Sequence, residues 1–378
     1  MYKRIIKAQI EAKMFKGKAI ILVGPRQVGK TTLATEILKT GKRKWEKESI
    51  KFNCDNPTDR ESLTEKDFEF LQNLIGEQKI ILIDEAQKVE TIGQTIKLLV
   101  EGFGKTKQII ATGSSSINLL EKTTEPLTGR KVVFYLYPLS AEELLGEKGS
   151  LRWQKELEAF LRFGSYPEVI KAQSRKGKIN VLTELSSSYL YKDVFEFQQI
   201  RNATVINDLL RALALQIGSQ VSYSEIASLI GIDRKTVERY VDLLEKNYII
   251  FRHSPYSKNI RRTISRMNKI YFFDLGIRNA ILNDFNELEN RNDVGALWEN
   301  FLAVERLKFQ TYHNIHCTNY FLRTYDGVEI DWLEASGGKL AGFEFKWKRS
   351  GGVGRKKRPR AGIDCLLIRP DSIKGFIV

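Results

Sequence analysis

The stretch AIILVGPRQVGKTTLATEIL, residues 19–38, decides the fold of the first part of the chain. It begins with five continuously apolar residues, as in a strand buried on both faces, and ends with apolar residues at helical spacing. Glycines let backbone N–H groups turn inward around a phosphate, and the following helix presents its positive end to the same group. The sequence therefore predicts a strand, a phosphate-binding loop and a helix. The loop residues expected to hold a nucleotide contain the full G-x-x-x-x-G-K-T pattern and are Gly24, Pro25, Arg26, Gln27, Val28, Gly29, Lys30, Thr31 and Thr32.

Two acidic residues at the end of a second apolar strand are placed to act on the bound nucleotide. The strand lies in KIILIDEAQKV, residues 79–89, and ends in Asp84 and Glu85. Lys30 would reach the β- and γ-phosphates, while the Thr31 hydroxyl and Asp84 would ligate Mg²⁺. Glu85 is placed to polarise the attacking water, which favours hydrolysis over binding alone. We therefore expect ATP and Mg²⁺ as cofactors.

Two further candidate residues lie beside the next two strands. The segment QIIATGSSS, residues 108–116, is apolar at first and ends in hydroxyls. Ser114, or in second place Thr112, is expected to contact the γ-phosphate or the attacking water, and a plain polar turn is the alternative. In LTGRKVVFYLYPLS, residues 127–140, Arg130 stands just ahead of another strand.

The order of these motifs resembles a known family. GPRQVGKTTL, LIDEAQKV, ATGSSS, LTGR and YPLSAEEL resemble, in this order, the archaeal-type AAA+ ATPases that carry a C-terminal domain of unknown function. The resemblance covers nearly the whole chain and implies an α/β multidomain fold with an AAA+ P-loop core and a helical lid. It also implies a homo-oligomer in which Arg130 is an arginine finger that reaches the γ-phosphate of the neighbouring subunit. The alternative for Arg130 is a surface arginine on a loop.

Composition and charge limit the cellular location and the class of binding partner that we expect. The chain has 42% hydrophobic and 28% charged residues, and no apolar run approaches the roughly 18 residues of a membrane span. We expect a cytoplasmic protein without membrane contact, because no secretory signal is recognisable. The formal net charge of +15 favours a polyanion, with double-stranded DNA as first candidate and RNA as alternative. The basic residues concentrate in residues 258–269 and 346–360, for which solvated loops are the simpler interpretation.

Residues 205–250 are expected to form three helices with helix-turn-helix proportions. Ile226, Leu229 and Ile230 share one face of the second helix, and the third begins with a capping aspartate. In the third helix we expect four residues at helical spacing to lie in the core, namely Val237, Tyr240, Val241 and Leu244. Strand-like segments on either side of residues 258–269 would complete a winged helix, which either contacts DNA or serves only as a packing module. The candidate DNA contacts are Arg234, Lys235 and Arg239 on the third helix, Arg261 and Arg262 on the wing, and Arg355, Lys356, Lys357 and Arg358 in the tail.

The C-terminal segment begins with a helix and continues with strands. Val294, Leu297, Phe301 and Val304 form the apolar stripe of the helix over residues 291–310. The stripe fades at Lys308, which predicts that the helix leaves the core near there. The order of helix, hairpin and two further strands resembles the PD-(D/E)XK restriction-endonuclease-like fold. That fold expects another helix after the third strand, whereas the segment SGGVGRKKRPRAG is short and glycine-rich.

Carboxylates and a lysine on neighbouring strands suggest a second metal site. Asp331 and Glu344 would hold a second Mg²⁺ or Mn²⁺, and Lys346 would orient the water or the phosphate. Glu299, on the preceding helix, would be the outer carboxylate. An ordinary charged strand pair is the alternative.

These patterns predict four domains, and they favour one function over two alternatives. The expected domains are an AAA+ P-loop core over residues 1–142, a helical lid over 143–204, a winged helix over 205–268 and a nuclease-like α/β domain over 269–378. The favoured function is a Mg²⁺-dependent ATPase that associates with DNA, in which hydrolysis controls assembly or grip. The alternatives are an ATP-controlled, metal-dependent DNA endonuclease and a signalling-type NTPase switch with a protein partner.

Overall fold

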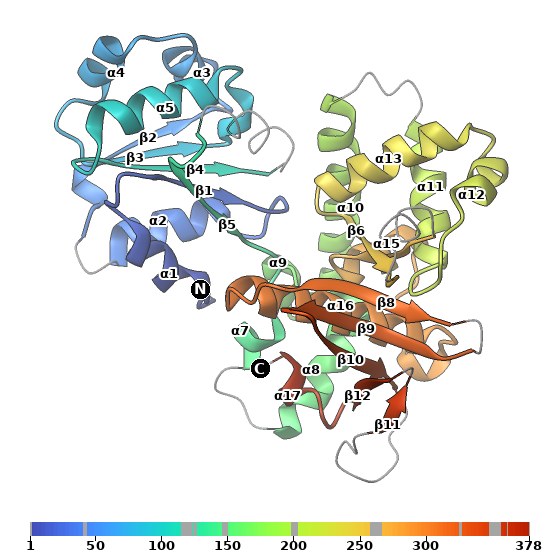
Figure 1. Ribbon diagram of the computed structural model, residues 1–378. Helices are drawn as coiled ribbons and strands as arrows, with labels where there is room; N and C mark the ends of the chain where they lie inside the picture. The colour runs from blue at the N-terminus through green and yellow to red at the C-terminus, as the bar shows by residue number, and fades with distance from the viewer. Residues whose placement is uncertain are drawn as a thin grey trace. The chain divides into compact units, whose positions relative to one another are not determined.

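The computed structural model describes residues 2–40, 44–114, 123, 127–145, 150–197, 203–257, 267–324, 327–347, 357–360 and 362–377. The chain divides into two compact units (Figure 1). The first comprises Met1–Tyr137 with Lys246–Tyr248, and the second comprises Pro138–Glu245 with Ile249–Val378. Among the described residues, no helix is both long and apolar enough to cross a membrane.

The first unit is built on a five-stranded parallel sheet. Its strands are β1 (Ala19–Val23), β2 (Ser49–Asn53), β3 (Ile80–Asp84), β4 (Gln108–Gly113) and β5 (Lys131–Tyr135), in the order β2-β3-β4-β1-β5. Its helices are α1 (Ile6–Lys13), α2 (Lys30–Thr40), α3 (Pro57–Leu63), α4 (Phe68–Ile75) and α5 (Ile92–Phe103), with 3-10 turns η1 (Glu46–Glu48) and η2 (Ala86–Lys88). Figure 1 shows α5 on one face of the sheet and α2 on the other. The sheet is therefore covered on both faces, which explains why β1, β3 and β4 are buried along their whole length.

The second unit combines helices with a seven-stranded sheet. Its helices are α7 (Ala141–Leu145), α8 (Ser150–Phe163), α9 (Pro167–Lys171), α10 (Arg175–Phe197), α11 (Ala203–Leu215), α12 (Tyr223–Ile230), α13 (Arg234–Lys246), α15 (Leu275–Leu282), α16 (Val294–Tyr312) and α17 (Lys374–Ile377), with the 3-10 turn η4 (Leu288–Asn290). Its strands are β6 (Ile250–Pro255), β7 (Lys269–Phe272), β8 (Thr318–Arg323), β9 (Glu329–Ser336), β10 (Lys339–Phe345), β11 (Lys357–Arg360) and β12 (Ile363–Ile368). The strand order is β11-β12-β10-β9-β8-β6-β7. Only β10–β12 and β6–β8 pair in parallel among these described strands.

Three helices and a hairpin occupy the region expected to hold a helix-turn-helix. Ser222 caps α12 by accepting a hydrogen bond from the Glu225 N–H, and Asp233 accepts one from the Thr236 N–H at the start of α13. The expected core residues of α13 are buried, namely Val237, Tyr240, Val241 and Leu244. The prediction for Leu229 was wrong, because its side chain is 73% exposed. Ile226 and Ala227 are the buried residues of α12, so the face of the helix that packs on the core is centred between them. Leu229 lies outside that face.

One sheet joins the hairpin of β6 and β7 to the strands that follow. Residues 250–253 of β6 pair with β7, whereas Ser254 and Pro255 pair with Tyr320 and Phe321 of β8. The strands expected in a wing and those expected in a nuclease-like domain thus belong to the same sheet. The boundary between residues 268 and 269 remains a prediction, and the sheet runs across it.

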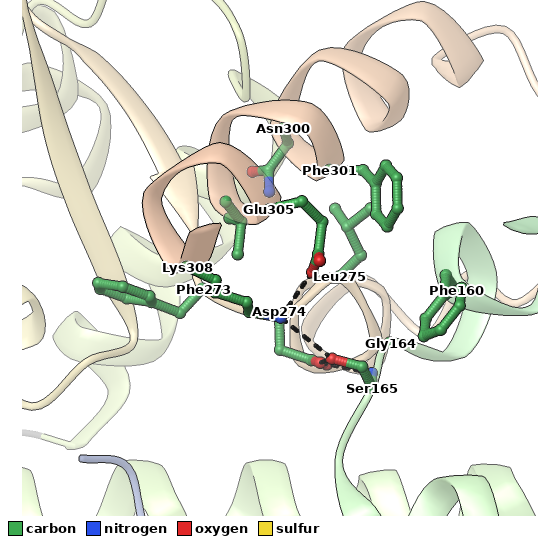
Figure 2. Close-up of a pocket in the computed structure, with 11 residues that line it drawn as sticks. Phe160, Gly164, Ser165, Phe273, Asp274, Leu275, Asn300, Phe301, Glu305 and Lys308 are labelled. Carbon is green, nitrogen blue, oxygen red and sulfur yellow. Dashed lines mark hydrogen bonds and ion pairs between the residues drawn. The ribbon is translucent and has the colours of Figure 1, made fainter. Parts of the chain in front are cut away.

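Helix α16 does not leave the core at Lys308, contrary to the prediction. It continues to Tyr312, and Lys308 is only 2% exposed. Lys308 Nζ donates hydrogen bonds to Glu305 Oε1 at 2.7 Å, to the Leu139 carbonyl oxygen at 3.2 Å and to Ser165 Oγ at 3.4 Å. Figure 2 shows this ammonium beside Glu305 and Ser165. Three acceptors satisfy the three N–H donors, so the lysine is a core residue.

Asp274 completes this buried polar cluster. One of its carboxylate oxygens accepts a 2.7 Å hydrogen bond from the Ser165 N–H, and the other accepts one from the Ile277 N–H at the start of α15. Burial raises the pKa of Asp274 to about 6. A Cβ at Gly164 would lie 2.0 Å from Asp274 Oδ1, so the close approach requires glycine at this position. The cluster joins the segment around residues 139–165 to α15 and α16 within the second unit.

We predict that Lys308→Met destabilises the second unit by about 3–5 kcal/mol, because it leaves Glu305 as a buried carboxylate without its cation. Chemical denaturation of the full chain measures the change. Lys339→Met is the matched control, since Lys339 is exposed in the same unit and its loss should have little effect. Equal unfolding free energies for the two variants would contradict a structural role of the buried ammonium.

Candidate functional site

The phosphate-binding loop lies between β1 and α2, as predicted. A Cβ on Gly24 would lie 2.0 Å from the Leu136 carbonyl oxygen, so the loop packs too closely for any other residue. Gly29 has a φ of +95°, a conformation that favours glycine at the turn into the helix. A close contact therefore requires glycine at position 24, and the positive φ favours glycine at position 29.

Lys30 lies beneath this loop. It is 5% exposed, and its Nζ donates to the carbonyl oxygens of Gly24 at 2.9 Å and Pro25 at 2.7 Å. Neutral carbonyls hold an ammonium less strongly than phosphate oxygens would. The lysine is thus positioned to exchange these contacts for those of a phosphate group.

Thr31 and Asp84 meet at the carboxyl ends of β1 and β3. The Thr31 hydroxyl donates to Asp84 Oδ1 at 2.7 Å, and the Thr112 hydroxyl donates to the same oxygen. Lys51 Nζ lies 3.6 Å from Asp84 Oδ2. A hydroxyl beside a carboxylate is the oxygen donor set that suits Mg²⁺. These residues therefore fit the ion that accompanies a nucleotide.

Glu85 is held by two side chains that the sequence patterns did not connect to it. Gln87 Nε2 donates to Glu85 Oε2 at 2.6 Å and to Ser114 Oγ at 3.1 Å, and Ser114 Oγ lies 3.3 Å from the same carboxylate oxygen. The backbone of Glu85 is left-handed, with a φ of 51°. Such a conformation persists only where the surroundings enforce it, and it is common at functional sites. The role of Ser114 at a phosphate stays a prediction, whereas Gln87 is an addition from the structure.

Arg130 lies just before β5, at the opposite end of the parallel strands from the loop. Lys131 is in register with Ala19 in the parallel pair β5–β1, so Arg130 lies beside the start of β1. Gly24 follows the far end of β1, about 16 Å away for a five-residue strand. Arg130 pairs with Glu101 at 2.8 Å, and its side chain is 43% exposed. It is therefore too far to contact a phosphate bound by its own loop.

The candidate DNA-binding residues of α13 are exposed. Arg234, Lys235 and Arg239 all face solvent, although Arg234 Nε also pairs with Glu238 Oε1 at 2.9 Å. Arg261, Arg262, Arg355 and Lys356 lie outside the described residues. Lys357 and Arg358 belong to β11, and only their backbone is described.

A second site lies in a cavity of about 740 Å³ in the second unit. The predicted residues Glu299, Asp331 and Lys346 line it, and so do Lys269 and Glu329, which the sequence analysis did not identify. Lys269 Nζ donates to Glu299 Oε1 at 2.8 Å and Glu329 Oε1 at 3.1 Å, and it lies 3.9 Å from Asp331 Oδ1. The carboxylates thus converge on an ammonium.

The electrostatics of this cavity follow from burial and from the crowded carboxylates. Burial first, and then the neighbouring Glu299 carboxylate, raise the pKa of Asp331 to about 7. Burial lowers the pKa of Lys269, but Glu299 and Asp331 outweigh it, so that this pKa is raised overall. The Lys269 ammonium therefore stays charged at neutral pH.

The two carboxylates of the predicted metal pair have separate contacts, and Asp331 lines the cavity whereas Glu344 is not among its lining residues. Asp331 Oδ2 accepts a 2.7 Å hydrogen bond from the Phe345 N–H, and Glu344 Oε1 lies 3.4 Å from Lys346 Nζ. In the part of the chain that the structure describes, no group of three or more His, Cys, Asp or Glu side chains is arranged to hold a metal ion. The residues present do not fit a second Mg²⁺ or Mn²⁺.

Three family models match successive parts of the chain. Residues 16–145 match a model described as an AAA domain, so an AAA-type core is confirmed for this segment. Residues 154–288 match a domain of unknown function (DUF8612), and residues 294–356 match another (DUF4143). The C-terminal domain of unknown function that the resemblance implied is thereby confirmed.

Relatives and solved structures complete the comparison. An uncharacterized protein of Mycobacterium tuberculosis is 26% identical over 369 residues, which cover 97% of this chain and 78% of the relative. An uncharacterized protein of Methanocaldococcus jannaschii is 27% identical over 357 residues, which cover 87% of this chain and 75% of the relative. The AMPPCP-bound DnaA of Aquifex aeolicus matches 64% of this chain and 86% of its own, at 15% identity and a TM-score of 0.30.

Proposed function

We propose that the chain is a Mg²⁺-dependent ATPase of the AAA+ class that associates with DNA. The observation that carries the ATPase proposal is the contact of Thr31 with Asp84, next to Glu85, beside a loop whose carbonyl oxygens hold the ammonium of Lys30. The match of residues 16–145 to the AAA domain supports it. In its more specific form, the proposal is that the protein is cytoplasmic, forms a homo-oligomer and acts on double-stranded DNA.

Four side chains of the first unit have separate roles in the proposed hydrolysis. Lys30 moves its ammonium from the Gly24 and Pro25 carbonyls to the β- and γ-phosphates. Bound Mg²⁺ neutralises charge that develops on the phosphates. Thr31 and Asp84 supply oxygens to hold that ion in place. Glu85 orients the attacking water and accepts its proton.

The contacts of Glu85 suit this role. Gln87 and Ser114 both bond to a single oxygen, Oε2. We propose that they fix the direction of the carboxylate, so that Glu85 Oε1 is left to accept from the water. This arrangement gives Ser114 a positioning function beside its predicted contact with the phosphate.

Several features support association with DNA. The net charge is +15, and α13 presents Arg234, Lys235 and Arg239 on its exposed side. The order of α11, α12, α13 and the antiparallel pair β6–β7 supports a winged helix, and an isolated bridge pairs Gln220 with Lys269 of β7. The helix α16 and strands β8 to β12 support descent of the tail from a restriction-endonuclease-like fold. A nuclease activity is disfavoured because the second metal does not fit.

The ATPase proposal predicts different effects for two substitutions. Lys30→Ala should abolish nucleotide binding, because it removes the charge that holds the phosphates, whereas Glu85→Gln should keep binding and stop turnover. A fluorescent nucleotide measures binding, and phosphate release measures turnover. Glu77→Gln is the matched control, since Glu77 is exposed in the same unit. Turnover by Glu85→Gln at the wild-type rate would show that another group orients the water.

Arg130 would act on the nucleotide of a neighbouring subunit. The rate per subunit should then rise with protein concentration, and Arg130→Ala should lower it on the order of a thousandfold. The exposed Lys105 provides the control variant Lys105→Ala. A rate independent of concentration, measured on a protein shown to be monomeric, would exclude this role.

Binding through phosphates predicts a steep dependence of DNA affinity on salt. Replacing Arg355, Lys356, Lys357 and Arg358 with glutamine should flatten the slope of log affinity against log salt by about 0.9 for each phosphate contact removed. The control replaces four exposed lysines of the first unit, namely Lys13, Lys16, Lys18 and Lys105. Equal flattening in both variants would mean that net charge, and not the basic tail, accounts for binding.

A further inference from the structure

The cavity in the second unit contains a cation of its own. Glu299, Glu329 and Asp331 line it, and the ammonium of Lys269 lies among them. We propose that Lys269 takes the place of a divalent metal ion in this cavity, so that the cavity binds neither Mg²⁺ nor Mn²⁺ and does not cleave nucleic acid. This inference goes beyond the ATPase and DNA-binding proposals and does not require either of them.

The first argument is that the ammonium and a metal would compete for the same oxygens. Lys269 Nζ lies 2.8 Å from Glu299 Oε1 and 3.1 Å from Glu329 Oε1. A metal ion would need these oxygens at about 2.0–2.6 Å, within a few ångströms of a fixed positive charge. Repulsion at that distance in a buried site is strong. One cation therefore excludes the other.

The second argument is that Lys269 is held firmly in place. Its side chain is 3% exposed, and its backbone begins β7 in register with His253 of β6. Its Nζ also lies 5.4 Å from the centre of the Phe321 ring. Moving the ammonium out would remove the ion-pair partner that Glu299 and Glu329 share and would strengthen the repulsion between these carboxylates and Asp331. The lysine is thus a permanent part of the site.

The third argument concerns the carboxylates themselves. Glu299 Oε1 also accepts a 2.6 Å hydrogen bond from the Tyr271 hydroxyl, and Asp331 Oδ2 accepts from the Phe345 N–H. Glu344 Oε1 lies 3.4 Å from Nζ of Lys346, the residue that follows β10. A donor of the protein therefore engages one oxygen of each of Glu299, Glu329 and Asp331. The hydrogen bonds and the ammonium together account for the geometry without a metal ion.

The first experiment measures Mn²⁺ binding to the nucleotide-free full chain. The wild-type protein and Asp331→Asn should bind the same number of Mn²⁺ ions, since Asp331 holds none. Both should also leave supercoiled plasmid intact in the presence of Mn²⁺. A Mn²⁺ ion that is bound by the wild type and lost in Asp331→Asn, or nicking that depends on Asp331, would overturn the proposal. Nucleotide is omitted, so failure of the ATPase proposal would not affect either result.

The second experiment removes the internal cation. Lys269→Met should lower the melting temperature, and added Mn²⁺ should raise it again by replacing the lost charge, with one additional ion bound per chain. Lys308→Met is the matched control, because Lys308 is an equally buried lysine beside Glu305 but outside this cavity. It should be destabilised without rescue by Mn²⁺. Lack of rescue in Lys269→Met, or equal rescue in both variants, would contradict the proposal. Should Lys269→Met fail to fold, the wild-type and Asp331→Asn comparison still decides the question.

Discussion

Carboxylates withdrawn from water require a counter-cation, and in the second unit the buried Lys269 and Lys308 supply it for Glu299 and Glu305. Helix α16 carries acidic residues of both clusters. Glu299 faces Lys269 in the large cavity, and Glu305 pairs with Lys308 on the same helix near residues 139–165. Glu299 therefore connects the helix to β7 by an ion pair, and Lys308 connects it to Leu139 and Ser165 by hydrogen bonds. The same requirement decides the chemistry of the cavity, because a carboxylate group already neutralised by an ammonium has no need of a metal.

In the nucleotide site of the first unit, the charged side chains Lys30 and Asp84 form hydrogen bonds with neutral groups. Lys30 is bonded to neutral carbonyls, and the Asp84 carboxylate accepts from the hydroxyls of Thr31 and Thr112. These contacts are weaker than a buried ion pair and exchange at lower cost when phosphate and Mg²⁺ arrive. Lys51 also approaches Asp84, but its side chain is 46% exposed and is not enclosed as Lys269 is. Two sites with similar residue types therefore differ in whether the cation belongs to the protein.

The parts of this structure that the sequence predicted are those set by local pattern. The phosphate loop, the Asp84–Glu85 pair and the core face of α13 each depend on residues a few positions apart. Lys308 was misread because its burial depends on Leu139 and Ser165, far away in the chain. Lys269 was missed for the same reason, since β7 is connected to Asp331 on β9 only through the pairing of β6 and β8. Glu329 lies two residues before Asp331 on β9, so the period of two along a strand could have identified it. Leu229 shows that helical spacing gives an apolar side but not its centre when a helix has only eight residues.

The central claim is that the chain uses one divalent metal, at the phosphate loop, and replaces a second with a lysine. The most direct test counts the Mn²⁺ ions bound per chain in the presence of a non-hydrolysable ATP analogue. The account predicts one ion, which depends on Thr31 and Asp84 and not on Asp331. Two ions, one of them lost when Asp331 is replaced by asparagine, would contradict it.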